Sequence, residues 1–189
     1  MSEAMFRSAR GALMFAFNFT HGTLKKSALA GMMGASPNGR GLGGLDGAAQ
    51  AGMIKAEVDH LPDLHQAILI ARYAPPVSPC ACGRACCRGS IETPEWGKAV
   101  NWLTEYVLVE GLVGTVSHYR LRRTLVMRYF GQKIYLVATA ELCGVNKNTA
   151  SAHNQKVTER LRHEERLAEY AIEGVLKSAG IVENLGVAA

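Results

Sequence analysis

The predicted fold follows from one stretch of sequence, LVATAELCGVNKNTASAH, which spans residues 136–153. Ala140 lies four residues before Gly144, a spacing that lets two helices cross closely while glycine takes the positive φ of a tight turn. Val145 would fill the space between the helices, and Asn146 would cap the second one. The stretch predicts a helix-turn-helix, although an ordinary helical hairpin also fits it.

The second helix of this stretch has two chemically different faces. His153 would lie on the inner face, where we interpret it as a packed core residue and not as a ligand. The outer face carries side chains that can read base edges in a DNA major groove, since amides pair with adenine and lysine with guanine or a phosphate. The predicted DNA-binding residues of this helix are Lys147, Asn148, Thr149, Ser151 and Gln155.

Positive charge is concentrated around the same stretch. Residues 119–166 carry ten Lys and Arg against four Glu, a net charge of +6, whereas the whole chain carries +5. A basic segment in an otherwise neutral chain is the electrostatic pattern of phosphate contact, although a solvated helix face also produces it. Arg120, Arg122 and Arg123 precede the stretch, and we predict that they contact the DNA backbone.

The whole chain predicts a mainly α fold, a helical bundle in three segments. Residues 1–52 are rich in glycine and alanine and predict a loosely ordered arm, because glycine at this density disfavours long regular elements. Residues 53–116 predict helices around a small cysteine-rich loop, and residues 117–189 predict the helix-turn-helix domain with a helical tail. Only residues 134–137 are strand-like.

Proline and glycine mark the predicted helix ends. Apolar side chains recur at helical spacing over residues 48–72, with a break at Pro62. A helix over residues 94–109 would place Trp96 and Trp102 in the core. Three glycines would separate the later helices. They are Gly131, Gly144 and Gly180.

A dense cysteine cluster precedes the middle helix. Four of the five cysteines lie within eight residues at C-x-C-x3-C-C spacing, too close together for disulfides that would join distant segments. Four thiolates complete a tetrahedral zinc shell, so the cluster predicts one zinc ion, although reduced cysteines packed in a turn also fit. The predicted metal ligands are Cys80, Cys82, Cys86 and Cys87. Reduced thiols favour a cytoplasmic location.

The remaining charged residues do not predict an enzyme. The chain has only three Asp, no phosphate-binding loop and no serine–histidine–aspartate arrangement. One acid and histidine cluster flanks a proline, where capping and solvated faces explain it better than a metal-dependent nuclease site. It consists of Glu57, Asp59, His60, Asp63 and His65. No apolar stretch approaches the length of a membrane helix, so a membrane is not an expected partner.

Taken in order, these features resemble a known family. The run GGLDGAAQAG over residues 43–52, the cysteine cluster, the pair Glu95-Trp96 and the sigma-region-4-like helix-turn-helix with its tail resemble the Q-type transcription antitermination proteins of lambdoid phages, closest to their bacterial relatives. The cysteine spacing departs from that of the lambda protein.

The resemblance implies a function and its partners. It implies a factor that binds a promoter-proximal DNA element, loads onto paused RNA polymerase holding sigma, and travels with the enzyme. It would narrow the RNA exit channel, with nascent RNA passing nearby, so that terminator hairpins cannot form. The N-terminal arm would be a docking segment for polymerase, and the protein would associate with the nucleoid.

Two other functions also fit the sequence. A plain repressor or activator would act only at initiation and bind a palindrome as a symmetric dimer, with residues 166–182 as the dimer helix. A recombinase or nuclease fragment would need Asp59 or Asp63 for DNA cleavage.

Overall fold

A computed structural model describes residues 4–19, 44–80, 82, 84–85, 87–109 and 118–183. The described part of the chain holds seven helices and one two-stranded hairpin, which confirms the mainly helical prediction. The helices are α1 (Ala9–Asn18), α3 (Gly44–Asp59), α4 (Asp63–Tyr73), α5 (Pro94–Val109), α6 (Tyr119–Tyr129), α7 (Leu136–Leu142) and α8 (Lys147–Ser178). The antiparallel strands are β1 (Val77–Pro79) and β2 (Ser90–Glu92).

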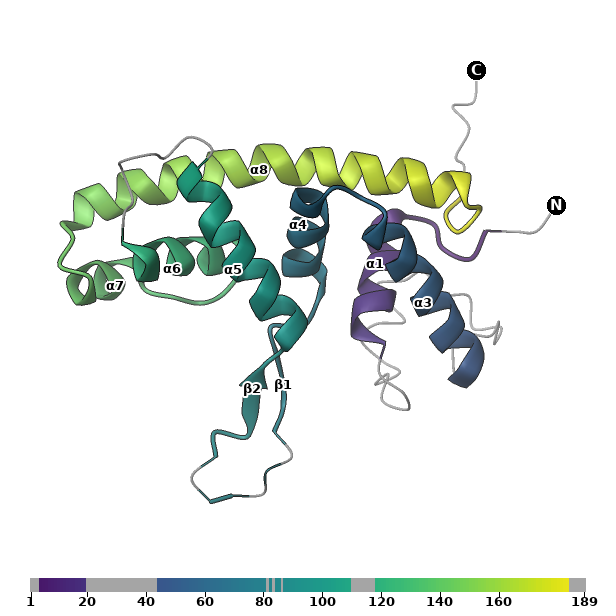
Figure 1. The fold of residues 1–189 in the computed structure, drawn as a ribbon, viewed down its shortest axis with the longest axis horizontal. Helices are drawn as coiled ribbons and strands as arrows, with labels where there is room; N and C mark the ends of the chain where they lie inside the picture. The colour runs from purple at the N-terminus through teal and green to yellow at the C-terminus, as the bar shows by residue number, and fades with distance from the viewer. Residues whose placement is uncertain are drawn as a thin grey trace.

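The long helix α8 contacts most of the other described helices. It runs along one side, and the shorter helices lie against its length (Figure 1). Its 32 residues correspond to about 48 Å of helix at 1.5 Å per residue. Buried side chains recur on α8 at spacings of three and four, as a helix covered on one side requires. They are Ala150, His153, Val157, Leu161, Glu164, Ala168, Ile172 and Leu176.

The N-terminal prediction is corrected by two helices. We expected a loosely ordered arm over residues 1–52, but α1 begins after its cap Ser8 and packs against α3. Phe15 and Phe17 are buried in α1, so burial of these aromatic side chains outweighs the helix-disfavouring effect of Gly11. Residues 20–43, which include Gly39, Gly41 and Gly43, lie outside the described residues.

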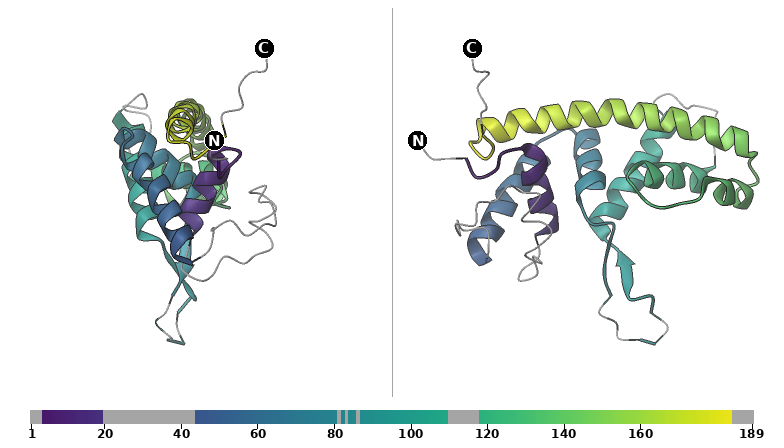
Figure 2. Two further views of the ribbon diagram at one scale, coloured as in Figure 1. Left: turned by 90° about the vertical axis from the view of Figure 1, so that its right-hand side faces the viewer. Right: turned by 180° about the vertical axis from the view of Figure 1, so that it is seen from behind.

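Most predicted helix ends agree with the structure. Pro62 separates α3 from α4, α5 begins at Pro94, and the three later glycines all adopt positive φ. The strand-like prediction for residues 134–137 is wrong, because Leu136 begins α7. The two strands lie elsewhere, in a hairpin that projects away from the helices on the side opposite α8 (Figure 2). One hydrophobic core contains side chains from most of the described chain, with Phe6 the first and Val182 the last of them in the sequence.

Candidate nucleic-acid interface and cysteine cluster

The turn glycine and the helix cap between α7 and α8 are those that the sequence predicts. Gly144 adopts a φ of +66° in the turn, and the Asn146 side chain caps α8 by accepting a hydrogen bond of 2.8 Å from the Asn148 backbone N–H. Ala140 and Ala150 are both buried, on helices that contact each other. Small side chains here let α7 and α8 pack closely. The turn therefore fixes the direction in which α8 begins.

The first turns of α8 separate a buried face from a polar exposed face. Ala150, His153 and Val157 are buried. The residues of α8 that are predicted to bind DNA are all exposed. One of them, Gln155, donates a hydrogen bond of 3.0 Å to Glu159. These exposed residues are Lys147, Asn148, Thr149, Ser151 and Gln155. The exposed face thus offers one cation, two amides and two hydroxyls to a partner.

The three arginines predicted to contact the DNA backbone differ in their exposure and in their partners within the protein. Arg120 is exposed, as the prediction requires. Arg122 corrects the prediction, because it is only 4% exposed, donates to the Thr104 carbonyl and lies 3.7 Å from a Glu105 carboxylate oxygen. A buried, bonded guanidinium fixes α6 against α5 and is not presented to a phosphate.

Arg123 is also engaged within the protein. Its guanidinium donates to the Glu92 carboxylate at 2.7 Å and to the Asn101 side-chain oxygen at 2.9 Å. Glu92 lies at the base of the hairpin, so Arg123 joins α6 to β2. A phosphate contact by Arg123 would require this ion pair to open.

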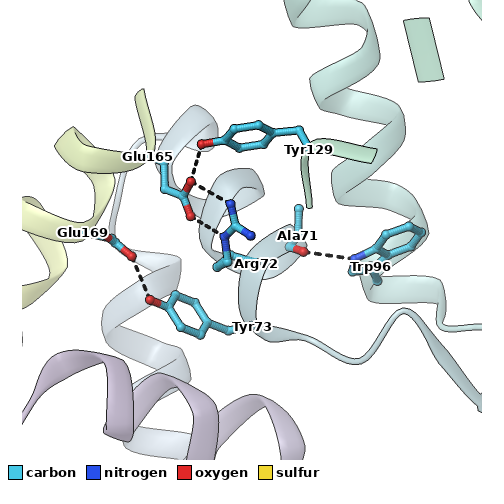
Figure 3. Close-up of polar contacts among 7 residues, drawn as sticks. All are labelled: Ala71, Arg72, Tyr73, Trp96, Tyr129, Glu165 and Glu169. Atoms are coloured by element: carbon cyan, nitrogen blue, oxygen red, sulfur yellow. Dashed lines mark hydrogen bonds and ion pairs between the residues drawn. The ribbon is translucent and has the colours of Figure 1, made fainter. Parts of the chain in front are cut away.

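A polar junction in the middle of α8 has no counterpart in the sequence predictions. Glu165 accepts two hydrogen bonds from Arg72, one of them 2.8 Å long, and a third from the Tyr129 hydroxyl (Figure 3). The Arg72 guanidinium also lies over the rings of Tyr129 and Phe130, 5.2 and 5.0 Å from their centroids. The junction ties α4 and α6 to α8.

Two neighbouring contacts extend this junction. Tyr73 donates to Glu169 at 2.9 Å, and the indole N–H of Trp96 donates to the Ala71 carbonyl at 3.1 Å (Figure 3). Burial first, and then the hydrogen bond to Glu169, raises the pKa of Tyr73 above its ordinary value. The phenol therefore stays protonated and remains a donor. One local signal could have revealed the junction: Glu165 is charged yet lies four residues after buried Leu161.

His153 lies beneath the exposed face of α8. Its ring is buried, and its Nδ1 has no hydrogen-bond partner among the described residues. Burial, and then the charge of Lys156, lowers the pKa of His153 below its ordinary value of 6.5. The structure thus favours the neutral imidazole, which agrees with the prediction of a packed core histidine.

Acidification is therefore expected to destabilise the fold through His153. Because the folded pKa is lowered, the unfolded chain takes up this proton first, so stability begins to fall as pH drops below the ordinary value of 6.5. The loss continues until the pH is below the folded pKa. The His153→Leu variant should lose less stability than the wild type between about pH 7.5 and about pH 5.5 in denaturant titrations. An equal loss in both proteins would contradict this role.

Three cysteines gather at the end of the hairpin. The sulfur atoms of Cys80, Cys82 and Cys87 lie within 4.8 Å of one another, close enough to share one metal ion. Cys86, the fourth predicted ligand, lies outside the described residues. The Arg84 backbone N–H lowers the pKa of the Cys82 thiol, which favours the thiolate that binds metals.

The hairpin itself has little else to stabilise it. No described residue of β1 or β2 is buried, and a two-stranded ribbon without a packed face is only marginally stable in water. Beyond the strands, the Cys80 N–H donates to the Gly89 carbonyl at 3.0 Å. A bound metal would therefore be the main clamp at this end of the hairpin.

Loss of the thiolates is expected to affect the hairpin alone. In the Cys80→Ser variant, or after chelation of metal, residues 77–92 should gain mobility in hydrogen exchange while far-UV circular dichroism and the main unfolding transition change little. The reason is that the hydrophobic core does not include the hairpin. The matched control is Cys143→Ser, in the turn after α7. Global unfolding of Cys80→Ser would contradict this expectation.

The acid and histidine cluster does not gather into a site. Among the described residues, the cysteines form the only group of three or more metal-ligating side chains close enough to hold an ion. His60 is exposed and lies 3.9 Å from Glu57, one turn earlier on the chain.

In the described part of the chain no helix is long and apolar enough to cross a membrane.

Comparisons with known proteins found no match to this chain. No protein-family model matches it, and neither a curated protein nor a solved structure matches it.

Proposed function

We propose that this protein is a transcription antitermination factor that reads duplex DNA with the exposed face of α8. The observation that carries the proposal is the α7–α8 junction, in which a positive-φ glycine and an asparagine cap direct a polar, partly basic helix face into solvent. Such a helix-turn-helix places the start of its second helix in a major groove. Lys147 and Asn148 would then contact bases, and Thr149 a phosphate.

The rest of the proposal follows from the resemblance to Q-type antitermination proteins. The factor would load onto RNA polymerase core and sigma at a promoter-proximal pause, remain bound, and narrow the RNA exit channel. It would act in the cytoplasm on the nucleoid and would need no catalysis. The glycine-rich segment within residues 1–52 would serve polymerase docking.

The cysteine hairpin is proposed to hold one zinc ion. Cys80, Cys82 and Cys87 supply three thiolates, and Cys86 is the proposed fourth ligand. Zinc prefers such tetrahedral thiolate sites, and its role here would be structural.

Transcription in vitro with a controlled order of addition tests this function. The template carries a cognate promoter and an intrinsic terminator, and the protein is added before or after polymerase leaves the promoter. Terminator readthrough only on early addition supports a factor that loads at the promoter and travels. No readthrough under either order would contradict antitermination.

A regulator that acts only at initiation is the second candidate. Leu167 and Tyr170 are exposed apolar residues on the outer surface of α8, as a dimer helix would require. This candidate expects a symmetric dimer on a palindrome, altered initiation and normal termination in the same assay.

A further inference from the structure

An aromatic stack lies on the surface where α5 meets α8. The rings of Trp102 and Tyr106 are nearly parallel, with centroids 5.7 Å apart and an interplanar angle of 12°. Trp102 was predicted to be a core residue, yet it is 40% exposed, whereas Trp96 is 2% exposed. Trp102 therefore stacks on Tyr106 while a substantial part of its side chain stays open to solvent.

A fixed positive charge adjoins this stack. The Arg160 guanidinium lies 5.7 Å from the Tyr106 centroid and donates to its hydroxyl at 2.7 and 3.1 Å. Its second partner, Glu164, is buried and lies 3.1 Å away. Arg160 is therefore held in place beside the aromatic pair while part of its side chain remains exposed.

Positive charge also connects the stack to the start of α8. Lys156 and Arg160 are four residues apart, so they share one face of the helix. Lys156 is exposed on this face. A polyanion that follows this face would meet the aromatic stack beside Arg160.

We propose that the Trp102–Tyr106 stack binds an unpaired nucleobase of a single-stranded nucleic acid, with Lys156 facing its phosphates and Arg160 holding Tyr106 in place. Aromatic side chains beside a basic track are the arrangement that binds single strands, because every base has a flat face that can stack. A base paired inside a duplex cannot reach the indole. Single-stranded RNA and an unwound DNA strand share this chemistry.

This site extends the proposed function and uses none of the residues assigned to duplex DNA. The two proposals can therefore fail separately. Loss of duplex binding would follow from changes at Lys147 or Asn148, whereas loss of single-strand binding would follow from changes at Trp102.

Tryptophan fluorescence of the full chain tests the proposal directly. Trp96 is buried, so quenching by an added oligonucleotide would report stacking on Trp102. Single-stranded RNA and single-stranded DNA of about ten nucleotides and a duplex of mixed sequence are titrated separately. We expect quenching by one or both single strands and little by the duplex, and the comparison of RNA with DNA identifies the source.

Variants separate stacking from folding. The Trp102→Leu variant should bind the single strand about 5- to 100-fold more weakly in fluorescence anisotropy, and Trp102→Phe should recover part of this affinity because it keeps a ring. Tyr170→Leu, an exposed aromatic near the other end of α8, is the matched control and should bind as the wild type does. Unchanged affinity in a folded Trp102→Leu variant would overturn the proposal. So would the absence of quenching by either single strand.

Discussion

Replacing Glu165 with alanine is expected to lower the free energy of unfolding by about 2 to 3 kcal/mol. The change removes the acceptor of two Arg72 hydrogen bonds and of the Tyr129 hydroxyl. Arg72 would remain partly buried between aromatic rings with its charge unpaired, and such a charge costs more than the lost contact alone. The figure is smaller than for a fully buried pair, because water reaches part of Arg72.

Two further variants on α8 are compared with Glu165→Ala, and urea titrations measure the free energy of unfolding of each. Glu173→Ala removes an exposed ion pair with Lys177 and should cost about 0.5 kcal/mol or less. Glu165→Gln keeps one acceptor oxygen and should be less damaging than Glu165→Ala. A loss from Glu165→Ala no larger than that from Glu173→Ala would show that the junction does not stabilise the fold.

Replacing Leu161 with alanine is expected to cost about 3 kcal/mol. Leu161 is fully buried on the inner face of α8 and belongs to the hydrophobic core. Its removal leaves a cavity where the helices of the bundle meet α8, and packed helices can close such a cavity only in part. Thermal and denaturant unfolding both measure the loss.

Leu167 provides the matched control on the same helix. It is exposed, so Leu167→Ala deletes the same atoms without leaving a cavity and should change stability by about 0.5 kcal/mol or less. Similar losses for both leucines would mean that α8 is not packed along its inner face as described.

Local sequence signals predicted the elements best where one residue type decides the backbone. Pro62 and Pro94 fix helix boundaries because proline lacks an N–H, and Gly144 marks the turn because glycine tolerates positive φ. The separation of buried from exposed residues in early α8 followed from helical periodicity alone.

Contacts between residues far apart in the sequence determine the structural features that local sequence patterns did not predict. Arg72 and Glu165 are 93 residues apart, and the sequence around either residue does not indicate that the two side chains pair. Arg122 lies in a basic cluster typical of phosphate contact, but packing against α5 buries it. Glycine content predicted an arm at the N-terminus, whereas α1 forms because its aromatic residues find a core contributed by later helices.

Selection from a randomised duplex library tests whether the exposed face of early α8 reads DNA sequence. The full chain should enrich one sequence, and Asn148→Ala should bind the enriched duplex about 10-fold or more weakly with little change on unrelated DNA. Ser178→Ala, at the other end of α8, should bind as the wild type does. Failure to enrich any sequence, or equal binding by Asn148→Ala and the wild type, would contradict sequence readout by this face of α8.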